Sequence, residues 1–252
     1  MVYTPLATGA TAAALLIGAY LYFEIGAFAE PQVPRTLFNE RKLGWALIAG
    51  LAVGSPLSVV LLVLFDSFAG GYVVSVVFEL AVLVALAELA QWLLLRSVYF
   101  GSDHSGPFYA LALRAGMAGI LILAAVTRYF GGLSVDAAGA ALVLTQAVAI
   151  LAVQVASGIL SLPASSGSRR VGGSPLSGGL LGGFGFFLLG LGLYFGSEFG
   201  IAAAALAAVG SFYVYRRLRR PTLGRVRPPP GPDDDPSGAV DAAKSGFGRT
   251  DR

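Results

Sequence analysis

The sequence predicts an all-α protein: a polytopic integral membrane bundle of seven transmembrane helices, with the N-terminus outside and the C-terminus cytoplasmic. Seven apolar stretches fill the chain from about residue 5 to residue 215. A helix of about 20 apolar residues crosses a bilayer, whose hydrocarbon core is about 30 Å thick. The mean hydropathy is +0.76 and only 12% of the residues are charged, whereas charged residues make up about a quarter of a soluble domain. The composition therefore favours a membrane protein.

The spans are expected, in order, at residues 5–28, 45–65, 72–97, 107–130, 137–162, 178–196 and 199–215. A secretory signal peptide carries Lys or Arg before its apolar run, and no such residue precedes the first apolar run of this chain. This run is therefore expected to remain in the protein as an uncleaved helix. The last two stretches are short and closely spaced, which is compatible with a tight hairpin or with one broken helix. The polar sequence Gly196-Ser197-Glu198 between them favours a turn, and hence two spans.

The orientation follows from the basic residues, which lie on alternate connections. The first, third and fifth connections and the segment after the last span carry Arg35, Arg41, Lys42, Arg96, Arg169, Arg170, Arg216, Arg217, Arg219 and Arg220. Arg128 alone departs from this alternation. Because cytoplasmic connections are enriched in Lys and Arg, these connections are expected in the cytoplasm and the protein in the cell (plasma) membrane.

The chain is expected to divide into two regions. Residues 1–215 form the seven-helix transmembrane domain, and residues 216–252 form a basic juxtamembrane stretch followed by a Pro- and Asp-rich tail. A segment of that composition cannot bury enough apolar surface to offset its chain entropy. The tail is therefore expected to be disordered in the cytoplasm.

Three ionisable residues lie well inside the predicted spans: Glu79 and Glu88 in the third, and Arg114 in the fourth. Such residues are costly in a bilayer and usually face the interior of a bundle. At 1.5 Å per residue, Glu88 lies about 24 Å from the outer end of its helix, and Arg114 about 10 Å from the cytoplasmic end of the next. These two residues should share one depth on antiparallel neighbours, so an interior ion pair is expected.

The fifth predicted span adds Gln146 and Gln154 at the levels of Glu79 and Glu88, respectively. The expectation is two polar layers: an inner one with Glu88, Gln91, Arg114 and Gln154, and an outer one with Glu79 and Gln146. One interpretation makes these residues a substrate or proton path, with Glu88 as the titrating group. The other makes them interhelical hydrogen bonds that fix the packing.

The sixth predicted span is rich in glycine, with the overlapping pairs Gly178/Gly182 and Gly179/Gly183. Small residues four apart allow a neighbouring helix backbone to approach closely. Tight packing within the bundle is favoured. A contact with another membrane subunit or a second copy, and a helix flexible enough to line a cavity, are the alternatives.

Several chemistries are excluded. The chain has no cysteine and one histidine, which rules out disulfides, thiolate metal sites and a haem held by two histidines of this chain. Its only lysines, Lys42 and Lys244, lie outside the last span, so no retinal Schiff base can form there. No catalytic or phosphate-binding motif is complete. We expect no cofactor, no metal and no catalytic residue. The basic residues are placed to meet anionic lipid headgroups, and no nucleic-acid partner is expected.

One short stretch carries a family resemblance. Ala87-Glu88-Leu89 is followed by Arg96, the aromatic pair Tyr99-Phe100 and His104. This stretch resembles a helix end in quinol-oxidising anchor subunits of the dimethyl sulfoxide reductase type, over fewer than 20 residues and with a spacing that differs by about one turn. The resemblance implies that Glu88 accepts a proton from a bound quinol near Arg96 or Arg114, and that electrons pass to a partner.

The preferred hypothesis is a non-enzymatic transporter-like or accessory subunit built around Glu79, Glu88, Arg114, Gln146 and Gln154. The alternatives are a quinone-facing anchor of a redox complex and a purely structural membrane partner. A transporter predicts a solvent-connected cavity at Glu88, and an anchor predicts an opening to the lipid there. A structural partner predicts closed packing in which every polar group is paired.

Overall fold

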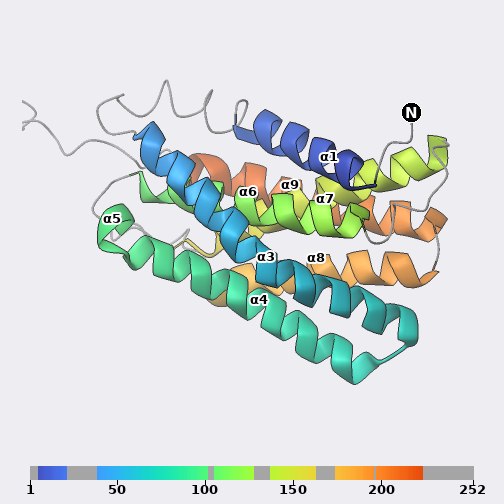
Figure 1. Cartoon of the computed structure of the whole chain (residues 1–252). Coiled ribbons are helices and arrows are strands. Elements are labelled where there is room, and N and C mark those ends of the chain that lie inside the picture. The colour runs from blue at the N-terminus through green and yellow to red at the C-terminus, as the bar shows by residue number, and fades with distance from the viewer. Residues whose placement is uncertain are drawn as a thin grey trace, which may run out of the picture.

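The computed structural model describes residues 5–21, 39–101, 105–127, 137–162, 174–195 and 197–223. In this part every regular element is a helix, and the long helices lie side by side (Figure 1). The helices are α1 (Pro5–Tyr20), α3 (Glu40–Gly70), α4 (Val73–Arg96), α5 (Val98–Gly101), α6 (Gly106–Ala125), α7 (Ala137–Leu160), α8 (Pro175–Phe195) and α9 (Ser197–Leu223).

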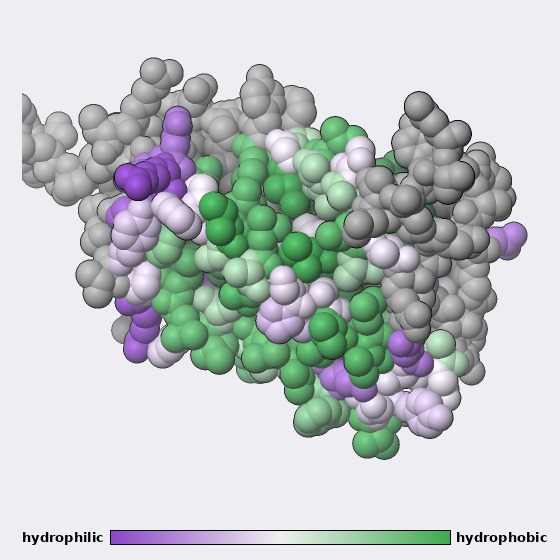
Figure 2. Space-filling model, in the orientation of Figure 1, coloured by the Kyte–Doolittle hydropathy of each residue, from purple (hydrophilic) through white to green (hydrophobic). Residues whose placement is uncertain are grey.

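Six of these helices are long and apolar enough to cross a membrane: α3, α4, α6, α7, α8 and α9. They match the second to seventh predicted spans. For the first predicted span, the described helix α1 has 16 residues, and residues 22–28 lie outside the described part. Hydrophobic side chains cover the middle of the face shown in Figure 2, and hydrophilic ones gather toward the helix ends. The chain is a multi-pass helical protein of membrane type.

Helices α3 and α4 form a hairpin whose boundaries have clear local causes. The Asn39 side chain accepts a hydrogen bond from the Lys42 N–H at 3.2 Å, which caps the start of α3. At its end, Gly71 adopts a left-handed conformation with φ 73°, and its N–H donates to the Phe68 carbonyl at 3.2 Å. Glycine adopts this conformation without steric cost, so α3 stops there and α4 turns back alongside it.

Helix α6 lies at the centre of the bundle, with 83% of its span buried, and packs against α1, α3, α4 and α7. Its closest contact is with α3. A Cβ atom added to Gly116 would collide with the Leu47 carbonyl oxygen, and one added to Gly50 with the Leu113 carbonyl oxygen. Glycine at both positions therefore allows the two backbones to touch.

Helices α8 and α9 are two separate helices that pack together. Of the two arrangements that the sequence left open, this supports the hairpin and not one broken helix. A Cβ atom added to Gly192 would lie 2.9 Å from the Gly200 Cα atom, which shows how close the helices run. Helix α9 continues to Leu223, eight residues beyond the predicted end of the last span. The remainder of the predicted tail lies outside the described residues.

Glycines of α8 serve packing within the bundle. Gly182 lies directly against Ser157 and Gly185 against Val153, both on α7, and Gly178 lies against Ser161, the residue after α7. Gly190 accommodates the Phe68 ring of α3. The contact with another subunit or a second copy that the sequence suggested stays a prediction.

Candidate functional site

The interior of the bundle is organised around one arginine. The Arg114 side chain, on α6, is 1% exposed. Space for it comes from Gly158 of α7, where an added Cβ atom would lie 2.6 Å from the Arg114 Cγ atom. A larger residue at this position would occupy the volume that the arginine stem fills.

Each part of the guanidinium group donates to a different acceptor. Its Nε donates to Gln91 Oε1 at 2.6 Å, its Nη1 to Gln154 Oε1 at 3.2 Å, and its Nη2 to Glu88 Oε1 at 2.6 Å. The last contact is also an ion pair. Hydrogen bonds to ionised groups are shorter and stronger than neutral ones. The predicted pairing of Glu88 with Arg114 is thus present, and Gln154 belongs to the same cluster as predicted.

Neighbouring groups hold this cluster in place. Gln91 donates its amide to the Gly158 carbonyl at 3.0 Å, which orients its oxygen toward the arginine. The Ser157 hydroxyl lies 3.2 Å from Glu88 Oε1 and 2.9 Å from the Gly178 carbonyl oxygen. Because a hydroxyl has one proton to donate, it donates to one of these acceptors at a time. Ser157 therefore connects α7 with both α4 and α8.

In the described part of the chain, no hydrogen bond joins Glu79 and Gln146, the two residues of the predicted outer layer. Glu79 Oε1 accepts hydrogen bonds from Ser75 at 2.5 Å and from Ser67 of α3 at 3.0 Å. Its position, nine residues from Glu88, turns it to the opposite side of α4. Gln146 is buried on α7. Glu79 Oε2 and Gln146 Nε2 are buried without a hydrogen-bond partner among the described residues.

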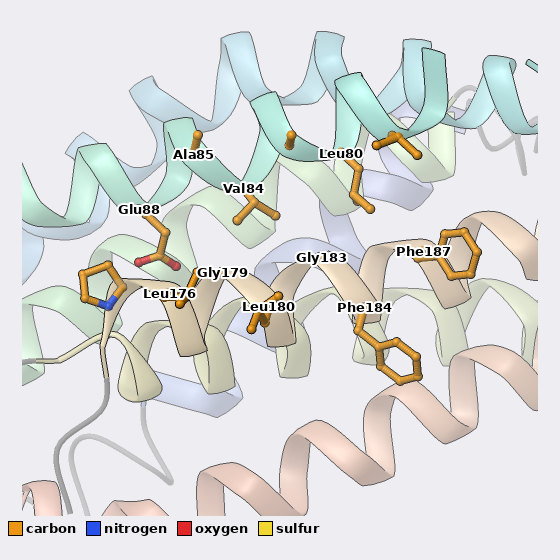
Figure 3. A pocket seen from close by; sticks show the side chains of 13 residues that line it. Leu80, Val84, Ala85, Glu88, Leu176, Gly179, Leu180, Gly183, Phe184 and Phe187 are labelled. Carbon is orange, nitrogen blue, oxygen red and sulfur yellow. The ribbon is translucent and has the colours of Figure 1, made fainter. Parts of the chain in front are cut away.

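A groove of about 650 Å³ lies between α4 and α8, directly outside this cluster (Figure 3). It is lined by six residues of α4 between Val77 and Glu88 and by seven of α8 between Pro175 and Phe187. Small residues on the two facing surfaces, including Ala81 and Gly183, leave this space open. The rims are apolar and exposed, as at Leu176 (73%) and Phe184 (61%), so the groove opens sideways, onto the apolar outer surface of the bundle.

Glu88 joins the groove to the cluster. In Figure 3 its carboxylate points from α4 toward Leu176 and Gly179 at the start of α8. The side chain is 13% exposed. Oε1 accepts from Arg114 and lies within hydrogen-bond distance of the Ser157 hydroxyl, and Oε2 has no such bond within the described part. Among the described residues that line the groove, Glu88 is the one whose side chain can form hydrogen bonds.

A second, much smaller cavity lies behind the groove. It measures about 10 Å³ and is lined by Glu88, Arg114, Gln154 and Ser157, among others. A volume of this size accommodates about one water molecule. The interior around Arg114 is therefore closely packed, and the larger space at Glu88 is the lateral groove.

Sequence reasoning missed the serine partners of Glu79 and the groove itself. Ser75 stands one helical turn before Glu79, a spacing that places both on one face, so this contact had a visible signal. Ser67 lies on α3, and it comes close to Glu79 only because the α3–α4 turn folds the two helices together. The groove depends on the separation of α4 and α8, and its lining residues are ordinary lipid-facing types.

Comparison with protein-family models, with curated proteins and with solved structures finds no match to this chain. In the described part of the chain, no group of three or more His, Cys, Asp or Glu side chains is placed to hold a metal ion. The fold and the site together define the class: a multi-pass helical membrane protein with a buried Arg/Gln/Glu polar cluster.

Proposed function

We propose that this protein is a membrane accessory subunit that binds a lipophilic molecule in the α4–α8 groove, with the polar end of the molecule at Glu88. The observation that carries the proposal is the groove, which ends at a carboxylate and opens toward lipid. Its volume of about 650 Å³ falls within the range of roughly 300–1,000 Å³ found for small-molecule sites.

The direction of the groove also supports an amphiphilic ligand. Its polar end lies beside Pro175, the first residue of α8, and so near the edge of the predicted membrane span. From there the groove follows α8 toward Phe187 with apolar side chains only. A molecule with its head near the interface and its tail along the helices would match this gradient.

The three sequence-based hypotheses differ in the opening that they require at Glu88. A transporter needs a path to solvent, and a quinone-facing anchor needs an opening to lipid. The two cavities that Glu88 lines, a lateral groove and a void of about 10 Å³, give more support to the lipid-side opening. A quinol is one molecule of the proposed kind, as the resemblance around Glu88 implies. Glu79 and Gln146 lie outside the groove lining and take no part in this proposal.

Filling the groove tests the proposal. An added Cβ atom at Gly183 makes only an ordinary contact with Val84, at 3.9 Å, so Gly183→Leu is expected to fill the groove without disturbing the backbone. Lipophilic molecules that copurify with the protein, extracted and quantified by mass spectrometry, should fall about tenfold or more, the loss expected when a ligand is sterically excluded by about 1.4 kcal/mol or more.

Gly210→Leu is the matched control. Gly210 lies on α9 and is exposed, and an added Cβ atom would meet nothing within 4 Å. This variant should copurify with the same molecules as the wild type. An unchanged set of bound molecules in Gly183→Leu would contradict the proposal, provided that both variants elute as monodisperse protein.

We also propose the orientation expected from the basic residues: N-terminus outside, C-terminus cytoplasmic, in the plasma membrane. One contact supports placing the basic residues of α3 and α4 at one end of the bundle: the Lys42 ammonium of α3 lies 4.9 Å from the ring centroid of Tyr99, which follows α4 on α5. Within α4, the Arg96 guanidinium lies 4.5 Å from the ring centroid of Trp92. Such aromatic residues are typical of the membrane interface.

Because the chain has no cysteine, single cysteines can report this orientation. Tyr72→Cys, at the α3–α4 turn, should react with a membrane-impermeant maleimide on intact cells. Lys42→Cys, at the other end of α3, should react only after the cells are permeabilised. The reverse pattern would show that the orientation is inverted.

A further inference from the structure

We propose that the groove selects amphiphiles with a neutral, hydrogen-bond-donating headgroup, the hydroxyl of an alcohol or phenol, over ammonium, carboxylate or ketone headgroups on the same tail. This inference rests on the proposed function and names the class of its ligand. Two properties of the site, its hydrogen-bonding capacity and its charge balance, lead to it independently.

The hydrogen-bonding capacity of the groove is that of an acceptor. Apart from Glu88, the described residues of its lining are Ala, Val, Leu, Gly, Pro and Phe, none of which has a polar side chain. An ionised carboxylate only accepts hydrogen bonds, and Glu88 is held in an ion pair by Arg114. A ketone or quinone carbonyl would be desolvated there without a donor, whereas a hydroxyl would donate to the carboxylate.

The charge balance of the site is neutral. One carboxylate, Glu88, faces one guanidinium, Arg114, at 2.6 Å, and Gln91 and Gln154 add no charge. An ammonium headgroup would leave the cluster with a net positive charge in an apolar surrounding, and a carboxylate headgroup with a net negative one. Arg114 is 1% exposed and lies behind Glu88, so an anion in the groove meets the carboxylate first. A hydroxyl adds no charge.

The second carboxylate oxygen of Glu88, Oε2, is the acceptor available to a ligand in the groove. Oε1 of Glu88 accepts from Arg114 and lies beside the Ser157 hydroxyl, which leaves Oε2 for a headgroup that enters from the groove. The lining of α4 runs from Val77 to Glu88, a helical length of about 16 Å at 1.5 Å per residue. This length suits a single extended tail with the headgroup at one end.

The test uses the purified full chain in lipid nanodiscs and a tetradecanol analogue that carries a diazirine in its tail. After irradiation, labelled residues are mapped by mass spectrometry. Tetradecanol, tetradecylammonium, tetradecanoate and the methyl ketone of equal chain length then compete for the label. We expect labelling of α4 and α8 groove residues, and competition by tetradecanol at concentrations about tenfold lower than by the other three, as one hydrogen bond to a charged acceptor predicts.

A double variant tests the role of Glu88 while preserving neutrality. Changing Glu88→Gln together with Arg114→Gln removes both charges and leaves an amide, which donates as well as accepts. The advantage of tetradecanol over the ketone should then shrink to about twofold or less, with the amide donating to the ketone. The wild-type competition alone remains decisive if this variant does not fold.

The outcomes separate the inference from the proposed function. Groove labelling that Gly183→Leu abolishes and Gly210→Leu preserves, but without a preference for the hydroxyl, would overturn the headgroup inference and leave the groove as a binding site. Labelling that never maps to the groove, or that Gly183→Leu does not change, would overturn the proposed function itself.

Discussion

Replacement of Gly116 by leucine should prevent the folded bundle from accumulating. The built Cβ atom collides with the Leu47 carbonyl oxygen and lies 3.0 Å from the Gly50 Cα atom. Both obstacles are backbone, so no side-chain rotation relieves the clash, and α3 must move away from the central helix. Overpacking of a core costs about 1–3 kcal/mol and more where the backbone must shift, and we expect a loss at or above the top of this range.

The measurement is the yield of monodisperse protein after detergent extraction, together with its thermal unfolding. Gly44→Leu, on α3, the helix that Gly116 contacts, faces open space. It controls for the effect of a leucine in a transmembrane helix and should behave as the wild type. Wild-type yield and unfolding temperature for Gly116→Leu would show that α3 and α6 do not touch at this point.

The second large effect is expected at the ion pair. Glu88→Gln leaves Arg114 1% exposed with no counter-charge, and a guanidinium does not deprotonate in proteins. Removing one partner of a buried ion pair typically costs about 3–5 kcal/mol. Because the replacing amide still accepts from the arginine, we expect about 3 kcal/mol, measured as the change in the free energy of unfolding in micelles.

The double change at Glu88 and Arg114 should be less damaging than the two single losses added together. With both residues replaced by glutamine, no buried charge remains, so a coupling free energy of about 2 kcal/mol is expected, within the range for residues in direct contact. Two reference cycles combine Gln154→Leu with the change at Glu88 and with the change at Arg114. They give the coupling free energy of an uncharged member of the cluster, for comparison with that of the ion pair. Additive losses for Glu88 and Arg114 would mean that the ion pair contributes no coupling to stability.

Much of the architecture was predictable from the sequence because bilayer physics is simple. Apolar runs gave the positions of the six described spanning helices, although α3 extends from Glu40 to Gly70 beyond the predicted 45–65. The Asn39 cap and Gly71 set the two ends of α3. Hydropathy measures only how apolar a stretch is, so it does not detect such capping residues. The pairing of Glu88 with Arg114 was predictable because equal depth on antiparallel neighbours leaves few partners for a charge in hydrocarbon.

Equal depth alone does not decide which side of a helix a residue faces. Glu79 and Gln146 were grouped by depth, but Glu79 is bonded to Ser67 and Ser75 on the α3 side of α4. The glycine pairs of α8 were visible, whereas the Gly50–Gly116 contact was not singled out. These two glycines lie on different helices, so their contact cannot be recognised until α3 is known to pack against α6. The groove depends in the same way on the packing of two helices.

The central position of Arg114 has a consequence for biogenesis. An arginine at mid-helix raises the free energy of inserting that helix by about 2.5–3.5 kcal/mol, and α6 is the helix that carries it. Synthesis proceeds from the N-terminus, and Glu88 precedes Arg114 by 26 residues. The nascent α4 thus delivers the carboxylate to the bilayer first, and α6 leaves the translocon beside a helix that already holds its counter-charge.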